Sequence, residues 1–287
     1  MPLETTEIKK LQEILANETD MYFLRRTPIL LAHLSPKPEQ LLLEIGCGRG
    51  YFINMINKIF NCKAIGIELD SDIAQLAMEN LKSNTPLLAR ANALNLPFNN
   101  NTFDRILMTE VLEHIEDDKQ ALSELIRVSK PGAKVAISVP NQNYPFLWDP
   151  LNWLLEGLFK KPIRTGFLAG IWANHCRLYT ADKLRELLLL AGLKIESITP
   201  CTHYCFPFAH NLVYGIGKEL LIRGYLPKQI VVAADRMSSE QNSKSLLNPI
   251  NIINKIFRAI DRLNDYFPKY NSSVGLIALA SLPDKAS

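Results

Sequence analysis

The sequence predicts an α/β fold in which a mostly parallel sheet of seven strands carries helices on both faces. Short apolar runs with the length of buried strands alternate with segments whose apolar residues recur at helical spacing. Three glycines stand where the first apolar run passes into a helix. Such alternation is typical of parallel sheets, because each connection crosses over through a helix. The 287 residues, 47% of them hydrophobic, suffice for one large core with helical additions.

We expect residues 1–38 to form a helical cover over the sheet. Apolar residues share one helical face in residues 5–16 and again in 20–33, and a Ser-Pro-Lys-Pro linker at 35–38 follows. The segment could also form a lid over a ligand. Because the segment has no glycine hinge, we expect a cover.

The segment Glu44-Ile-Gly-Cys-Gly-Arg-Gly50 joins the first strand, at 41–43, to a helix at 51–60. Glycine tolerates positive φ and lets a ligand approach the backbone, and the first N–H groups of a helix lack partners. The turn through Gly46, Gly48 and Gly50 therefore favours nucleotide binding over an ordinary tight turn.

Glu68 ends the second strand, at 63–67, about 20 residues after the glycines. At that spacing a carboxylate can accept the hydroxyl protons of a ribose, and the alternative is an exposed strand-end acid. Asp70 or Ser71 is the expected cap of the next helix, at 71–82. We expect Glu68 to bind a ribose.

The remaining elements follow in the same alternation. Lys130-Pro-Gly132 is expected to end the helix before the fifth strand. The other strands are expected at 86–91, 103–109, 133–139, 193–199 and 274–280, and the other core helices at 117–129 and 184–191.

Several motifs fall in order along the chain: Leu43-Glu-Ile-Gly-Cys-Gly-Arg-Gly50, Gly66-Ile-Glu-Leu-Asp70, Leu96-Pro-Phe98, Thr102-Phe-Asp104, Glu110-Val-Leu-Glu-His114, Arg127-Val-Ser-Lys-Pro-Gly132 and Val139-Pro-Asn141. They resemble those of class I S-adenosylmethionine-dependent methyltransferases, in the broad subgroup that includes small-molecule and ubiquinone-pathway enzymes. The resemblance covers about residues 40–200 and the last strand. It implies a Rossmann-like sheet whose last strand lies antiparallel beside the fifth.

The resemblance also implies S-adenosyl-L-methionine as the cofactor and assigns residues to it. Asn92 stands where the family usually has Asp, and an amide oxygen can still accept from the adenine amino group. A nicotinamide-binding domain is the competing interpretation, but Tyr51 occupies the place of its third glycine. The implied cofactor residues are Glu44, Gly46, Gly48 and Gly50 at the methionine part, Glu68 at the ribose, Asn92 and Ala93 at the adenine, and Thr109 and Glu110 at the methionine side.

Glu110, Glu113 and His114 have the i, i+3, i+4 spacing that would place them on one face of a helix. Matching residues of some ubiquinone-pathway O-methyltransferases are thought to hold magnesium. We expect no metal, with Glu110 beside the cofactor and His114 packed or capping, because many family members share these residues without one.

Residues 141–180 form a connection too long for an ordinary loop, and it is rich in aromatic residues. They could form the wall of an apolar acceptor pocket or a flap with a small core of its own. His175 is the candidate general base, because imidazole titrates near neutral pH. It could equally tie the flap to the helix capped by Thr180, and both interpretations stay open. Farther on, Cys201, Cys205 and His210 fit no common zinc spacing, so a packed loop is expected.

The expected organisation is a core with its flap at 39–200, a helical insertion at 201–272 and a last strand at 273–282. Amphipathic helices are expected at 211–226 and 248–267, where basic residues border the apolar faces. That combination suits an ordinary cap and also an interfacial helix, so peripheral membrane contact is a hypothesis.

The composition narrows the partners and the compartment. A net charge of +3 is too small to indicate a nucleic-acid partner. Five cysteines, an odd number, and the lack of a signal-peptide pattern favour a cytoplasmic protein. The apolar cap favours a small-molecule or lipid-like acceptor over a protein or a nucleic acid. The alternative from another class is a protein that binds the cofactor without catalysis. The sequence does not predict an oligomeric state.

Overall fold

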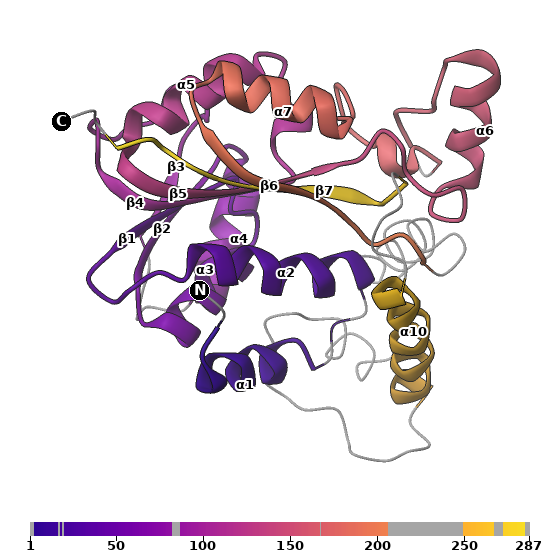
Figure 1. The fold of residues 1–287 in the computed structure, drawn as a ribbon, viewed down its shortest axis with the longest axis horizontal. Helices are drawn as coiled ribbons and strands as arrows, with labels where there is room; N and C mark the ends of the chain where they lie inside the picture. Colours follow the sequence, from indigo (N-terminus) through magenta and orange to yellow (C-terminus); the bar gives the residue numbers. More distant parts are fainter. Residues whose placement is uncertain are drawn as a thin grey trace.

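A seven-stranded sheet forms the centre of the protein (Figure 1). The order of its strands is β3-β2-β1-β4-β5-β7-β6. The computed structural model describes residues 3–16, 18, 20–81, 87–166, 168–205, 249–266 and 272–284. The strands are β1 (Leu41–Ile45), β2 (Lys63–Glu68), β3 (Leu87–Arg90), β4 (Phe103–Thr109), β5 (Ser129–Pro140), β6 (Lys194–Cys201) and β7 (Gly275–Ser281).

The strand directions confirm the predicted Rossmann-like fold. β1 pairs parallel with β2 and β4, β2 with β3, and β4 with β5. β7 lies antiparallel between β5 and β6. The carboxyl ends of β1 to β4 therefore meet at one edge of the sheet, which is the edge where such folds bind ligands.

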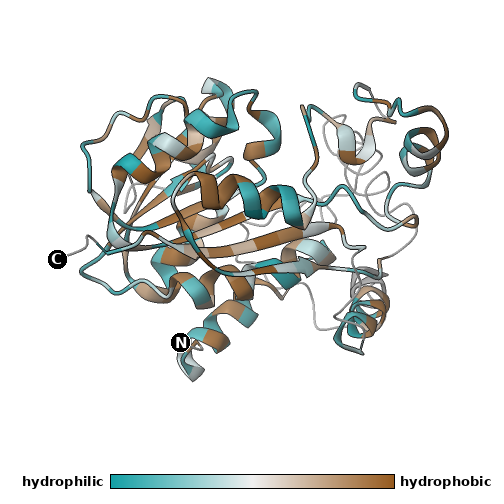
Figure 2. Cartoon of the chain, turned by 45° about the horizontal axis from the view of Figure 1, so that its top comes forward, coloured by the Kyte–Doolittle hydropathy of each residue, from teal (hydrophilic) through white to brown (hydrophobic). Residues whose placement is uncertain are grey.

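Helices cover both faces of the sheet (Figure 1). Leu42 and Leu107 pack with α2 and α3 on one face, while Leu43 and Met108 face α5 and α7 on the other. Figure 2 shows the result, with apolar strands between helices that turn hydrophilic residues outward. The helices are α1 (Thr5–Ile14), α2 (Met21–Leu34), α3 (Tyr51–Phe60), α4 (Ser71–Leu81), η1 (Leu112–His114), α5 (Asp118–Val128), α6 (Pro150–Phe159), η2 (Gly170–Trp172), α7 (Ala181–Leu190) and α10 (Pro249–Tyr266).

The end of α5 and the start of β5 lie before the predicted helix-ending tripeptide. Lys130-Pro-Gly132 does follow a helix, but α5 already ends at Val128 and the tripeptide lies inside β5. Phe103 pairs with Ser129, and the ladder resumes at Arg105 and Lys134, so an irregularity accommodates the extra residues. The strand is therefore longer than its apolar run, because pairing with β4 continues past the helix-ending signal.

The cap is described in part. α10 confirms the helix expected at 248–267, and its Phe257 and Ile260 pack against the core beside α2. The helix expected at 211–226 and His210 lie outside the described residues. Cys201 ends β6, and the segment 202–205 is a packed loop, in which Asn264 of α10 accepts hydrogen bonds from the backbone N–H groups of His203 and Tyr204.

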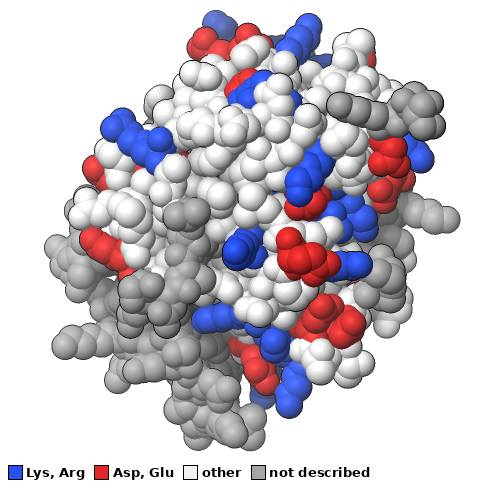
Figure 3. All heavy atoms as spheres, turned by 90° about the vertical axis from the view of Figure 1, so that its left-hand side faces the viewer, with Lys and Arg blue, Asp and Glu red and all other residues white. Residues whose placement is uncertain are grey.

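Two surface features bear on possible partners. None of the helices in the described ranges is both long and apolar enough to span a bilayer. On the face drawn in Figure 3, basic and acidic side chains of the described residues lie close to one another in scattered groups between uncharged areas. That part of the surface therefore lacks an extended field of one sign.

Candidate active site

The glycine turn at the carboxyl end of β1 has the backbone that its sequence predicts. Gly46, Gly48 and Gly50 all have positive φ, at 71°, 52° and 80°. A β-carbon at Gly46 would also overlap the side chain of Val111. The N–H groups of Gly46 and Cys47 donate to the carbonyl of Ile67, 2.9 Å away in each case, so β2 fixes the start of the turn. The turn passes over the sheet edge and enters α3, as in a nucleotide-binding site.

Glu68 stands beside this turn and shapes it. Its Oε2 accepts a 2.9 Å hydrogen bond from the N–H of Gly48, and its Oε1 accepts one of 2.8 Å from Leu69. Asp70 caps α4 by accepting from the N–H groups of Asp72 and Ile73. The carboxylate of Glu68 is thus held at the edge of the glycine turn, where the sequence predicts the ribose.

The other predicted cofactor residues extend along the same edge. Asn92 is exposed just after β3, and its Oδ1 accepts a 2.9 Å hydrogen bond from the N–H of Leu94. Its amide NH₂ is a second group that could meet a purine edge. Ala93 follows it half-buried, and Thr109 is the buried last residue of β4. Four consecutive strands of the sheet, β3 to β4 in spatial order, therefore contribute to one edge.

Glu44 is buried beneath the turn, with 2% of its surface exposed. Burial raises its pKa well above 4.5, and the backbone N–H of Ile53 lowers it in part. Its Oε2 has no hydrogen-bond partner among the described residues. Glu44 thus supports the turn from below, at the start of α3.

Glu110 is held in place by side chains of α2 and β5. Its Oε1 lies 2.7 Å from Nη1 of Arg26, and it accepts from the hydroxyls of Ser138 at 2.7 Å and Tyr22 at 3.1 Å. Burial, followed by the charge of Glu110, raises the pKa of Tyr22. Residues 20–34 therefore do more than cover the sheet, since α2 supplies two side chains to its carboxyl edge.

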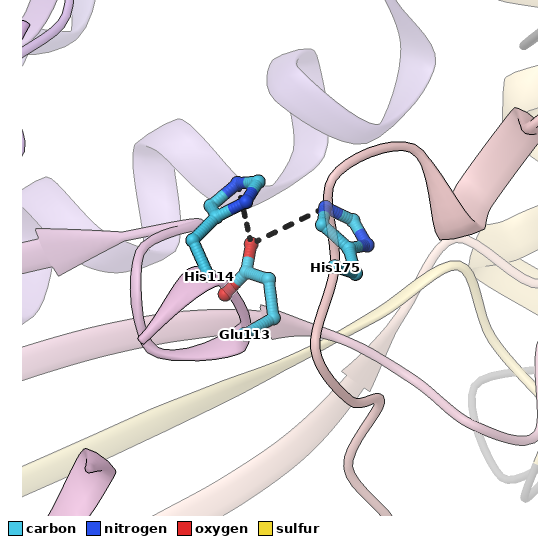
Figure 4. A group of neighbouring side chains, drawn as sticks. All are labelled: Glu113, His114 and His175. Carbon is cyan, nitrogen blue, oxygen red and sulfur yellow. Dashed lines mark ion pairs between the residues drawn. The ribbon is translucent and has the colours of Figure 1, made fainter. Parts of the chain in front are cut away.

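The expected grouping of Glu110, Glu113 and His114 on one helical face is not formed. Glu110 has a left-handed φ of 54°, and only Leu112–His114 forms a helical turn, of the 3-10 type. As a result Glu110 points to α2, while Glu113 lies with His114 and His175 (Figure 4). The Nε2 atoms of both histidines lie 3.9 Å from Oε1 of Glu113.

Burial is the main cause of a raised pKa at Glu113, and the charge of Glu110 adds to it. The two histidine rings meet edge to face, with centroids 4.6 Å apart. The backbone N–H of His175 donates to the carbonyl of Trp172, 3.1 Å away. The flap thus brings the predicted base to a buried acid of the core.

The sequence reasoning missed Tyr22, Arg26 and Ser138. Tyr22 and Arg26 are separated by one helical turn within an apolar segment, which was a usable signal. Arg25 is adjacent and points instead to Asp261 of α10, so the sequence does not tell which arginine faces inward. Ser138 lies in a strand interior with no distinguishing pattern.

Comparisons with known proteins agree with this geometry. Residues 43–137 match the model of a methyltransferase domain family. An O-methyltransferase of Pyrenophora dematioidea is 31% identical over 180 residues, which cover 60% of each protein. The chain spans little more than half of the length of curated relatives that it matches, from 54% to 60% in three of them.

Solved structures share the fold at low sequence identity. A phosphoethanolamine N-methyltransferase 2 of Haemonchus contortus in complex with S-adenosyl-L-methionine has a TM-score of 0.55 at 18% identity, covering 96% of this chain and 57% of that one. The [4+2]-cyclase SpnF has a TM-score of 0.55 at 15% identity, covering 99% and 98%. Residues 43–137 therefore carry a methyltransferase domain, and the motifs and the strand order agree with those of class I S-adenosylmethionine-dependent methyltransferases.

Proposed function

We propose that this protein transfers the methyl group of S-adenosyl-L-methionine to a small-molecule or lipid-like acceptor. The observation that carries the proposal is the glycine turn at the carboxyl edge of the sheet. Glu68 holds this turn, because its Oε2 accepts a hydrogen bond from the N–H of Gly48. The reaction is an in-line displacement on a methyl group that the sulfonium charge already activates. The protein therefore mainly has to position donor and acceptor.

The fold alone does not choose the reaction, because a [4+2]-cyclase shares it. What favours methyl transfer is the match of residues 43–137 to a methyltransferase domain, together with relatives named as O- and N-methyltransferases. A protein that binds the cofactor without turning it over is the competing function. Binding and turnover must therefore be measured separately.

His175 is the residue that we propose to act on the acceptor. It comes from the flap, and its Nε2 faces Glu113 near the carboxyl end of β4. A histidine there can take the proton from an attacking hydroxyl, or it can act through a bound ion. Either role places the acceptor between the flap and the sheet edge.

The flap offers apolar surface on its outer side, around α6, which stands apart from the sheet in Figure 1. Leu158 is 73% and Phe159 64% exposed. Lys160 and Lys161 follow directly and are exposed. Apolar and basic side chains together suit the surface of an anionic membrane, so we propose that the flap touches membrane to reach an apolar acceptor. The exposed apolar residues here are Phe146, Leu147, Trp153, Leu154, Leu158 and Phe159.

Calorimetric titration tests the cofactor assignment. Glu68→Gln should weaken binding of S-adenosyl-L-methionine by about 1–3 kcal/mol, or ~5- to ~150-fold in Kd, because a ribose hydroxyl and the Gly48 N–H both lose a charged acceptor. Glu79→Gln, an exposed acid of α4, is the matched control and should bind as the wild type does. Unchanged affinity in Glu68→Gln, or preference of the wild type for a nicotinamide cofactor, overturns the assignment.

Turnover is tested with methyl-labelled cofactor on two extracts, one of soluble metabolites and one of lipids. Label in a lipid-fraction product supports the lipid-like acceptor, and label in a soluble product directs the search to small polar acceptors. Tight binding of the cofactor without label transfer in either extract would favour the binding protein.

A further inference from the structure

A buried carboxylate faces two imidazole nitrogens across a gap that is too wide for hydrogen bonds. The side chain of Glu113 has no exposed surface, and no other described residue donates a hydrogen bond to either of its oxygens. Oε1 lies 3.9 Å from Nε2 of His114 and 3.9 Å from Nε2 of His175. An ionised carboxylate buried without partners costs several kcal/mol, and a cation in the gap would remove that cost.

The orientation of His114 is fixed by a backbone carbonyl. Its Nδ1 lies 2.9 Å from the carbonyl oxygen of Asn174. Because a carbonyl only accepts, Nδ1 must carry the proton, and in the neutral ring Nε2 then turns its lone pair toward Glu113. In metal sites, a histidine that binds the ion through one ring nitrogen usually donates a hydrogen bond to a carbonyl or carboxylate through the other.

The two chain segments that carry these side chains are tied together independently. The N–H of Cys176 donates to the carbonyl of Glu113 at 2.8 Å. Arg177 donates to the carbonyls of Ile115 at 2.8 Å and Glu116 at 2.7 Å. The three side chains thus approach one another on a backbone that is already positioned, and their ligand atoms all lie within 4.8 Å of one another.

We propose that Glu113, His114 and His175 bind a divalent transition-metal ion of the Zn²⁺ class (Figure 4). Two imidazoles and one carboxylate suit Zn²⁺, Co²⁺, Fe²⁺ or Mn²⁺ better than Mg²⁺ or Ca²⁺, which prefer oxygen ligands. Ligand bonds of about 2.1 Å place neighbouring ligands of a tetrahedral ion ~3.4 Å apart. The two 3.9 Å distances from Oε1 of Glu113 to the histidine Nε2 atoms therefore need to shorten by only about half an ångström when an ion binds.

This set differs from the one that the helical spacing suggested. Glu110 is turned toward Arg26, Tyr22 and Ser138, so it is not a ligand in this arrangement. The third ligand is His175, which comes from the flap. His114 is 41% exposed, which leaves one side of the ion open to solvent, as in sites that keep a free coordination position.

The ion would clasp the flap to the core. It would bind Nε2 of His175, which is the nitrogen that a general base would use. In the proposed methyl transfer, His175 would then act through the ion. Only this last consequence rests on the proposed function. Metal binding itself is measured without cofactor or acceptor, and its failure is therefore distinguishable from a failure of methyl transfer.

The full chain, stripped with a chelator and then desalted, is titrated with Zn²⁺ and, in parallel, with Co²⁺. We expect one equivalent of Zn²⁺, a rise in Tm, and a visible Co²⁺ absorption band typical of nitrogen and oxygen ligands. Mg²⁺ at the same concentration should change nothing. His114→Ala should weaken Zn²⁺ binding at least ~10- to 100-fold and abolish the shift in Tm, and Glu113→Gln, which keeps the shape of the side chain, should do the same.

Two control variants separate this site from its alternatives. Glu116→Gln, an exposed acid next to the cluster, should bind Zn²⁺ as the wild type does. Glu110→Gln should also bind one equivalent of Zn²⁺. If the ligands were instead Glu110, Glu113 and His114, this variant would lose the ion. Absence of stoichiometric binding by the wild type, or equal binding by His114→Ala and the wild type, overturns the proposal.

Discussion

Arg26 of α2 and Glu110 after β4 form an ion pair with Nη1 and Oε1 2.7 Å apart. The pair is largely buried, since the side chains are 10% and 29% exposed. Arg26 also stacks over the rings of Tyr22 and Phe23, at 4.7 and 5.5 Å from their centroids. It therefore attaches α2 to the carboxyl edge of the sheet, where the cofactor is proposed to bind.

A double-mutant cycle on this pair should show strong coupling. Arg26→Met and Glu110→Gln should each lower the free energy of unfolding by about 2–4 kcal/mol, because each leaves the other partner buried without its counter-charge. The double variant should lose at least ~1 kcal/mol less than the sum of the two single variants. Denaturant unfolding measures all four proteins, and strict additivity would show that the pair is not coupled.

Gly275 at the start of β7 leaves room for the phenol ring of Tyr22. A β-carbon there would overlap the ring, so Gly275→Ala should displace Tyr22 and lower the free energy of unfolding by about 1–3 kcal/mol. Gly157→Ala is the matched control. Its β-carbon meets nothing within 4 Å inside α6, so the same substitution should raise stability by about 0.5–1 kcal/mol. Tyr22→Leu should rescue much of the loss at Gly275, and a lack of rescue would count against the contact.

Glu44 should make stability fall as pH rises. Burial raises its pKa in the folded protein above 4.5, so the folded state keeps a proton that the unfolded state releases first. The contribution is fully present below pH 4.5 and is lost as pH rises toward the folded pKa. Glu44→Gln lacks this loss, so its stability relative to the wild type should increase as pH rises above the ordinary carboxyl pKa of 4.5.

Glu124 should change stability with pH in the opposite direction, so it serves as the control for that experiment. Its hydrogen bonds from Arg127 lower its pKa, so its contribution is present above the ordinary carboxyl pKa and is lost as pH falls. Glu124→Gln should therefore be less stable than the wild type at neutral pH and approach it in acid. Parallel pH profiles for the two variants would contradict the assignment.

His175→Gln distinguishes a catalytic from a structural role. If His175 acts as a base on the acceptor in the metal-free protein, turnover should fall about 10²–10⁴-fold while the Kd for S-adenosyl-L-methionine and the Tm stay close to those of the metal-free wild type. If it ties the flap, Tm and cofactor affinity should fall with it. A stable and fully active variant would exclude both roles, and the matched variant Asn174→Asp tests whether any change in this loop has the same effect.

Apolar residues of α6 should mediate binding to anionic vesicles. In flotation with vesicles of phosphatidylcholine and phosphatidylserine, a variant with glutamine at Trp153, Leu154, Leu158 and Phe159 should lose at least ~10-fold in bound fraction. Leu189→Gln with Leu190→Gln, two exposed positions of α7, is the matched control and should float as the wild type does. If the wild type stays unbound at low salt, where basic contacts are strongest, membrane contact is wrong.

The sequence by itself determined the fold and indicated the edge of the sheet where the cofactor is proposed to bind. Glycines at 46, 48 and 50, an acid at the end of the second strand and helical spacing between apolar runs are local signals, because each acts through the backbone of a few neighbouring residues. Since parallel strands place their carboxyl ends together, these local signals also placed the site along one edge.

Only the tertiary structure decided which side chains meet across the chain. Glu110 and Glu113 are three residues apart, yet a left-handed φ at Glu110 and a single 3-10 turn direct one to Arg26 and the other to His175. Spacing assumes a continuous helix, and it fails where the backbone leaves helical geometry. Arg26, Ser138 and His175 reached their partners through packing between distant segments, for which no short pattern in the sequence exists.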